Sequence, residues 1–174
     1  MYYFNATTGI TSTFNATTNT GSVTADTYLV NYNNVERLNI IGTDYNDLIV
    51  GSNGNDTLTG GKGNDSLIGG NGTDTFVFYN YNEGVDDLYD FNATNDLIQI
   101  SAVYFAGGLS SGSLSANQFT IGTSATTTNQ RFIYNSATGG LFFDLDGSAS
   151  GFTQVKFAQL SAGLSLTENN FVVV

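Results

Sequence analysis

Gly42–Val77 reads GTDYNDLIV, GSNGNDTLT, GGKGNDSLI and GGNGTDTFV, four nine-residue segments that follow one another without a gap. Each segment opens with glycine or small polar residues, has Asp at its sixth position and has a large apolar residue at its eighth. Repetition at a fixed short period is typical of solenoids, in which each repeat stacks on its neighbours. This stretch therefore decides the fold class, and the flanking residues are interpreted around it.

The period has a physical interpretation. Glycines among the first four positions allow tight turns with positive φ angles. The last three positions, such as Thr57–Thr59, suit a very short strand whose middle residue faces inward. Strands this short cannot form independent hairpins, so stacked copies must share hydrogen-bonded ladders and one apolar column. The pattern predicts an all-β chain with a stacked core.

The aspartates of the segments predict a cation. If two segments form one coil, Asp47 stacks on Asp65 at about one strand spacing (~4.8 Å). Asp56 stacks on Asp74 in the same way. Two carboxylates at that distance repel by roughly 3 kcal/mol at an effective dielectric constant of about 20. Lys62 is the only cationic residue in the segments, and Ca²⁺ prefers oxygen ligands of this kind. Ordinary Asp-rich turns are the alternative, but four in-phase copies favour calcium.

The segments resemble the haemolysin-type calcium-binding (RTX) repeat, G-G-x-G-x-D-x-U-x, in which U is a large apolar residue. The third and fourth segments match it fully, the second departs at Ser52, and the first departs at Thr43 and Tyr45. The resemblance implies a right-handed parallel β-roll with Ca²⁺ held between loops that stack on the same side.

The resemblance also implies a ligand set. In that family the earlier loop supplies carbonyl groups from positions two and four, the later loop supplies them from positions one and three, and both supply Asp. The first implied site consists of Thr43, Tyr45, Asp47, Gly60, Lys62 and Asp65. The second consists of Ser52, Gly54, Asp56, Gly69, Asn71 and Asp74. Backbone carbonyls bind whatever the side chain, so the departures at positions 43 and 45 need not abolish the first site.

Residues 87–100 resemble a D-x-I-x-D-F…D-x-I-x-I segment that often follows the repeats and completes the terminal calcium sites of the family. The resemblance therefore implies that the two Ca²⁺ ions can rise to three or four. The residues of these terminal sites would be Gly61, Gly63, Gly70, Gly72, Asp87 and Asp90. For Asp87 and Asp90 a solvated acidic strand edge is the alternative, and the sequence leaves both interpretations open.

The flanking residues predict caps on the roll. Residues 1–41 are expected to form N-terminal capping strands, 42–78 the calcium-binding roll, and 79–174 a β-rich C-terminal cap. Ile40 lies nine residues before Ile49, which predicts an apolar coil without a calcium loop. The cap is expected to be a small sheet or sandwich packed on the end of the roll, with strands at 118–121, 131–134, 141–143, 155–157 and 171–174.

Three local features of the cap can also be interpreted. Single helical turns are expected near Ser113 and Thr167. Asp144–Gly147 resembles the opening of an EF-hand loop, but the glycine at position six and the distal Glu of that loop are missing. A hairpin turn at Asp146-Gly147 is therefore the favoured interpretation.

The composition excludes several functions. The net charge is −11 with four cationic residues, which argues against nucleic acid and anionic membranes as partners and predicts that folding is coupled to calcium. There is no His and no Cys, and no nucleophile motif, so an enzyme is not expected. No apolar run is long enough to insert into a membrane, and Met1–Phe4 lacks the features of a cleavable N-terminal signal peptide.

The C-terminal residues suggest a route out of the cell. RFIYNSATGGLFFDLDGS from Arg131 and LTENNFVVV from Leu166 resemble the target region of proteins exported by type I secretion. The resemblance implies a transient partner, the type I machinery, and a secreted, extracellular or cell-surface location. The leading hypothesis is a non-catalytic, calcium-dependent folding and secretion module. The alternative is an extracellular, calcium-stabilised module that resembles an adhesin or S-layer module and binds carbohydrate, such as a cell-surface polysaccharide, or the cell surface. Its candidate aromatic residues are Tyr79, Tyr81, Tyr89, Tyr104 and Phe105.

Overall fold

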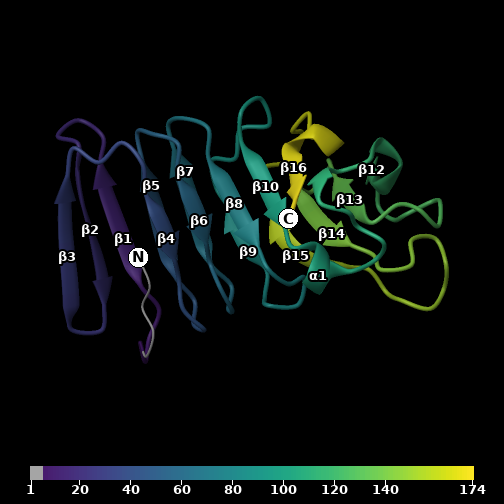
Figure 1. Cartoon of the computed structure of the whole chain (residues 1–174), viewed down its shortest axis with the longest axis horizontal. Coiled ribbons are helices and arrows are strands. Elements are labelled where there is room, and N and C mark those ends of the chain that lie inside the picture. The colour runs from purple at the N-terminus through teal and green to yellow at the C-terminus, as the bar shows by residue number, and fades with distance from the viewer. Residues whose placement is uncertain (1–5) are drawn as a thin grey trace.

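A computed structural model describes residues 6–174 of the chain. Met1–Phe4, on which the expectation of no cleavable signal peptide rests, lies outside the described residues. Two sheets, of ten and six strands, run along the long axis of the molecule (Figure 1). Within the described part of the chain, no helix has both the length and the apolar character needed to cross a membrane.

The strands are numbered along the chain, and their order across each sheet is different. The ten-stranded sheet contains β12 (Phe119–Ile121), β13 (Phe132–Asn135), β14 (Gly140–Phe143), β15 (Val155–Gln159), β9 (Asp86–Leu88), β7 (Ser66–Gly70), β5 (Leu48–Ser52), β1 (Thr11–Asn15), β2 (Thr20–Ala25) and β3 (Tyr28–Asn33). The six-stranded sheet contains β11 (Gly112–Ser113), β16 (Phe171–Val173), β10 (Leu97–Ile100), β8 (Thr75–Phe78), β6 (Thr57–Thr59) and β4 (Asn39–Ile41). The short helices are α1 (Ala102–Phe105), η1 (Ala116–Gln118) and η2 (Glu168–Asn170).

Successive nonapeptides alternate between the two sheets. β5 and β7 are parallel neighbours in the ten-stranded sheet, and Ile49 lies opposite Leu67. β6 and β8 are parallel neighbours in the six-stranded sheet, and Leu58 lies opposite Phe76. The register repeats every two nonapeptides, so the prediction of a parallel β-roll with two segments per coil is confirmed.

The apolar residue at the eighth position of each segment forms the core. Its side chain is fully buried in all four segments. Ile40 lies opposite Leu58 in register, which confirms the predicted apolar coil before the repeats. The column of the six-stranded sheet then runs on through both caps, with each side chain at most 2 % exposed, and comprises Ile40, Leu58, Phe76, Ile98 and Phe171.

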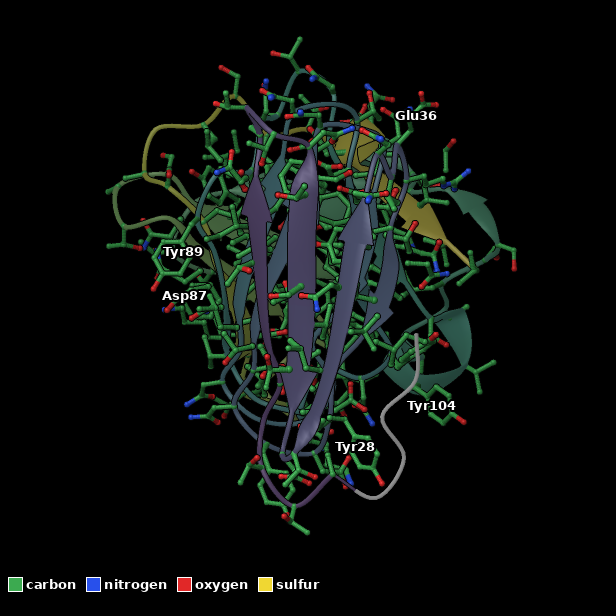
Figure 2. The ribbon with its side chains drawn as sticks, turned by 90° about the vertical axis from the view of Figure 1, so that its left-hand side faces the viewer. Tyr28, Glu36, Asp87, Tyr89 and Tyr104 are labelled. Atoms are coloured by element: carbon green, nitrogen blue, oxygen red, sulfur yellow. The ribbon has the colours of Figure 1, made fainter. Side chains whose placement is uncertain are left out.

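The sheets cross both expected domain boundaries. On the N-terminal side, β1 pairs in parallel with β5 and begins an antiparallel meander, β1–β3. Figure 2 shows this meander spread across the end of the roll. On the C-terminal side, β15 pairs with β9 and β16 pairs with β10. The C-terminal strands therefore extend the two existing sheets instead of forming a separate small sheet.

An aromatic cluster fills the C-terminal end of the core. The Phe105 ring contacts those of Phe143 and Phe157 edge-on, with centroids 5.1 and 5.4 Å apart. Tyr81 stacks on Phe143 at 4.9 Å. Phe105 is fully buried and Tyr81 packs against the core, so neither presents an exposed ring for surface binding. The exposed candidates that remain are Tyr79, Tyr89 and Tyr104.

Two local predictions need correction. The helical turn expected near Ser113 begins instead at Ala116, because Gly112–Ser113 pairs with β16. The turn near Thr167 is confirmed as η2, whose N-cap is Thr167. β14 and β15 do form an antiparallel pair, and the chain turns at Asp146–Ala149, where the Ala149 N–H donates to the Asp146 carbonyl. This turn lies within a longer loop over residues 144–154, so it is not a tight hairpin.

Candidate metal centre

Six buried aspartates form two ladders, one on each side of the roll. In every step the backbone N–H of one Asp donates to the Oδ1 atom of the Asp in the next coil. The donor–acceptor distances are 2.8 Å for Asp47 to Asp65 and for Asp56 to Asp74, 3.1 Å for Asp65 to Asp86, and 3.0 Å for Asp74 to Asp96. All six side chains are at most 5 % exposed. The predicted stacking of Asp47 on Asp65 and of Asp56 on Asp74 is thus present.

In the four repeats, the second carboxylate oxygen of each Asp faces the first residue of its own loop. In the first segment the backbone N–H of Thr43 donates to Asp47 Oδ2 at 2.6 Å, and the Thr43 hydroxyl also donates to this carboxylate. Ser52 makes the equivalent contacts with Asp56 in the second segment. The hydroxyl residues at position two, which depart from the family pattern, therefore support the carboxylate of their own loop.

The third segment lacks this support. Its second residue is Gly61, and Asp65 Oδ2 is buried without any hydrogen-bond partner. A buried carboxylate oxygen without a partner is costly unless a cation meets it. Burial raises the pKa of Asp65 to about 7, and the nearby charges of Asp47 and Glu83 act in the same direction. Among the ladder carboxylates of the described residues, this is the buried oxygen that lacks a partner, and a cation or a proton would neutralise it.

Other ladder carboxyls share this electrostatic situation. Burial raises the pKa of Asp74 to about 7, with Asp96, Asp56 and Asp90 contributing. Burial also raises the pKa of Asp86 to about 8, and the neighbouring charge of Asp65 adds to the shift. The raised pKa values show that the ladder environment disfavours bare carboxylates.

Glycines bring carbonyl oxygens close to these carboxylates. A Cβ atom at Gly42 would lie 2.1 Å from the Gly60 carbonyl oxygen and 2.2 Å from Asp47 Oδ2. On the other side, a Cβ at Gly51 would lie 2.3 Å from the Gly69 carbonyl oxygen and 2.6 Å from an Asp56 oxygen. Both sides thus place a carbonyl from position one of the later loop beside the Asp of the earlier loop, as the ligand set requires.

The Thr43 and Ser52 carbonyls, two further predicted ligands, each accept one backbone hydrogen bond. The Thr43 carbonyl accepts from the backbone N–H of Lys62 at 3.1 Å, and the Ser52 carbonyl accepts from that of Asn71 at 3.3 Å. Each carbonyl oxygen can accept a second interaction. The predicted ligand Tyr45 lies in the loop of Thr43, and Gly54 lies in the loop of Ser52. Gly54 packs so closely on Glu36 that a Cβ atom at Gly54 would lie 1.5 Å from the Glu36 carbonyl oxygen.

The cationic side chain in the repeats does not neutralise the ladders. Lys62 Nζ contacts Asp44 at 2.6 Å, and both side chains are more than half exposed. Within residues 6–174, no three acidic side chains converge as a ready-made metal cluster. Each predicted site therefore has two carboxylates at most, and backbone carbonyls must complete the coordination of a hard ion such as Ca²⁺.

The structure places different aspartates at the terminal positions from those predicted. Asp86 follows Asp65 in one ladder, and Asp96 follows Asp74 in the other. Asp87 lies opposite Ser66 in β9, and Figure 2 shows its side chain on the outside of the roll beside Tyr89. The predicted segment alignment was one residue too late at this point.

Asp90 lies outside the ladder but contacts the fourth loop. Its carboxylate accepts from the backbone N–H groups of Gly69 and Gly70, each at 2.8 Å. Asp90 therefore accepts from loop glycines, whereas Asp65, Asp74, Asp86 and Asp96 each accept from the backbone N–H of another Asp. Gly61, Gly63, Gly70 and Gly72 all have positive φ angles between 96° and 122°, and each approaches the backbone of the preceding loop on its own side of the roll.

Two irregular coils contain the terminal aspartates. Asp86 and Leu88 repeat the Asp-x-apolar pattern, and so do Asp96 and Ile98. Gly84, with a φ of 145°, packs against the Gly63 carbonyl. Gly72 packs against the Gly54 carbonyl in the same way. The backbone N–H of Asn92 donates to Asp96 Oδ2 at 2.8 Å, which repeats the contact of Thr43 with Asp47. The resemblance placed the terminal sites in this stretch, but extra residues interrupt the period, and the Asp-x-apolar pattern was the signal that selects Asp86 and Asp96.

Comparison with known proteins supports this geometry. Residues 41–76 match the family model of the RTX calcium-binding nonapeptide repeat, in four copies. These residues are RTX repeats. RTX nonapeptide repeats bind calcium, and the matched residues contain Asp47, Asp56, Asp65 and Asp74 of the ladders. A search of curated proteins found no match.

One solved structure is similar over most of its length. It is the solution structure of the AlgE6R3 subunit from the Azotobacter vinelandii mannuronan C5-epimerase. The match covers 78 % of this chain and 77 % of that chain, at 21 % sequence identity and a TM-score of 0.27.

Metal-free protein is expected to lose stability as the pH rises. The pKa values of Asp65, Asp74 and Asp86 are higher in the fold than the ordinary value of 3.8, so the folded state binds more protons than the unfolded chain between about pH 4 and pH 8. Circular dichroism of resin-stripped protein should therefore show more β structure at about pH 5 than at about pH 8.5. Calcium should abolish the difference. Equal or greater β structure at the higher pH would contradict the electrostatic interpretation.

Proposed function

We propose that this chain is a calcium-dependent folding module of an exported bacterial protein, and that it catalyses no reaction. The observation that carries the proposal is the buried Asp65 Oδ2 atom, which has no partner within a ladder of stacked carboxylates. A bound Ca²⁺ ion would supply the missing partner and offset the repulsion between successive aspartates.

The two central sites would take the predicted ligands. One lies between the loops of Asp47 and Asp65, and the other between the loops of Asp56 and Asp74. Two terminal sites would follow, with Asp65 and Asp86 on one side and Asp74 and Asp96 on the other. Their carbonyls would come from the onward faces of the third and fourth loops, at Gly61, Gly63, Gly70 and Gly72. The proposal is therefore four ions, with Asp86 and Asp96 in the roles first assigned to Asp87 and Asp90.

The coupling of calcium to folding follows from the energetics. An ion present at about 100 times its dissociation constant stabilises the fold by roughly 2.7 kcal/mol per independent site. Native domains are stable by only about 5–15 kcal/mol, so several sites together decide whether the roll forms. The acidic repeats would stay unfolded where calcium is scarce and close where it is abundant.

A calcium titration with paired variants tests this function. Asp56→Asn keeps the shape of a ladder residue but removes its charge, and it should shift the folding midpoint to about tenfold higher calcium or more, since tenfold corresponds to about 1.4 kcal/mol. Asp44→Asn removes the same charge from an exposed pair and should leave the midpoint within about twofold. Circular dichroism gives the midpoint, and calorimetry gives the number of ions.

The outcome of that titration is decisive in either direction. A metal-free chain as folded as the calcium-loaded one at neutral pH, with no heat of binding, would contradict the proposal. So would equal shifts in the two variants, because the ladder position would then have no special role.

Export is the second part of the proposal. Segments of the C-terminal region resemble a type I target region, and a chain that remains unfolded at low calcium can pass through a narrow exporter. Full-length chain expressed in bacteria should reach the medium only when a type I exporter is present, and the extracellular fraction is measured by immunoblotting. A chain that stays inside the cells despite the exporter would refute this part while leaving calcium binding untouched.

Binding of a neutral saccharide is a second candidate function. An open cavity of about 540 Å³ lies on the β1–β3 meander. The rings of Phe14 and Tyr32 border it, nearly parallel and with centroids 6.5 Å apart. Its other lining residues are uncharged and include Asn15, Asn31 and Asn33. Apolar ring faces and convergent amides are the groups that saccharide sites use.

A glycan array in calcium tests this candidate. Binding should be lost in Tyr32→Ala and retained in Tyr104→Ala, since Tyr104 is exposed but lies far along the chain in α1. If no glycan binds, or if both variants bind equally, the cavity has no such role.

A further inference from the structure

The strand β3 forms one edge of the ten-stranded sheet and is unusually open. Among the described residues it pairs with β2 alone. Tyr28, Leu29 and Val30 are 72 %, 59 % and 36 % exposed, and Figure 2 shows Tyr28 where β3 begins, at the end of the roll. An edge strand presents a row of free backbone N–H and C=O groups. The edge therefore offers both backbone pairing and apolar contact to another strand.

The edge lacks the features that normally prevent such pairing. Natural edge strands are protected by charged residues, proline, bulges or very short length. β3 reads YLVNYN, is six residues long and pairs with β2 in an unbroken register. The edge at the other end of the same sheet, β12, is only three residues long. The sequence thus leaves one long edge of this sheet free of charge and of bulges.

The charge distribution indicates what can approach this edge. Eleven of the fifteen acidic residues lie from Glu36 to Asp96, and only Asp26 precedes them. Two copies of a chain with a net charge of −11 repel each other at most surfaces, and least at the uncharged meander. A basic partner would instead be attracted to the acidic middle of the roll. The uncharged edge therefore favours a second copy of the same chain.

We infer that two copies pair through β3, antiparallel and around a two-fold axis, so that their ten-stranded sheets become one. A two-fold axis perpendicular to the sheet maps each face of the sheet onto the same face of the second copy. Two residues can therefore lie opposite each other only if their side chains point to the same face of the joined sheet. A register centred on Val30 meets this condition. It places Val30 against the second copy's Val30 and Tyr28 against the second copy's Tyr32, so apolar side chains meet on one face.

Sedimentation of the calcium-loaded full chain tests the pairing. Between about 1 μM and 1 mM, the range of weak associations, the mass should rise from one chain to two. Val30→Lys and Val30→Glu should each weaken the dimer by about tenfold or more, because like charges would face each other. An equal mixture of the two variants should dimerise again, since opposite charges then meet.

A matched control separates pairing from misfolding. Val103→Lys introduces the same charge at an apolar residue that is 78 % exposed on α1, and it should dimerise as the unmodified chain does. Circular dichroism should show equal β content in all variants. A chain that remains monomeric throughout, a Val30→Lys variant that still dimerises, or a mixture that fails to recover would each overturn the inference.

Discussion

The stacking of buried carboxylates is the constraint on which the roll depends. Asp65, Asp74, Asp86 and Asp96 each accept through Oδ1 from the backbone N–H of the preceding ladder Asp, and this hydrogen bond fixes the register of successive coils. The same side chain carries a charge that repels the next one in the ladder. An asparagine could accept the hydrogen bond but could not bind a cation as strongly. The hydrogen bond alone does not need the charge, so aspartate at this position agrees with the proposed ion.

The ladders have different ends, and this gives the roll a direction. At the N-terminal end the backbone N–H groups of Ile10 and Leu38 take the place of an Asp N–H and donate to Asp47 and Asp56. Ile10 and Leu38 have no carboxylate, so no two-carboxylate space exists beyond them. At the other end the ladders continue to Asp86 and Asp96. Four pairs of stacked carboxylates result: Asp47 with Asp65, Asp65 with Asp86, Asp56 with Asp74, and Asp74 with Asp96. All four lie on the C-terminal side of the coils that contain Ile10 and Leu38.

The four regular repeats and their stacking could be predicted from the sequence, whereas the aspartates of the two irregular coils after them could not. Within Gly42–Val77 the offset between stacked aspartates is 18 residues, so the coil and its register follow from the period. The offset grows to 21 for Asp86 and 22 for Asp96, because extra residues enter the turns. The adjacent pair Asp86-Asp87 then offers two alignments, and only the side that faces the core distinguishes them. The parallel pairing of Ala158 with Asp86 joins residues far apart in sequence, which no local pattern encodes.

The distribution of charge and apolar surface explains why an ion can control the whole roll. In a solenoid each coil contacts only its neighbours, so stability is close to a sum over successive interfaces. The C-terminal end is held by the aromatic cluster around Phe105, and the N-terminal end by an almost uncharged meander. Between them, the interfaces bring acidic residues together, and the apolar column of each sheet is their main compensation. These central interfaces lack a compensating charge of their own, and because the two ends meet only through them, ions bound as proposed between the ladder aspartates would determine whether the sheets are continuous.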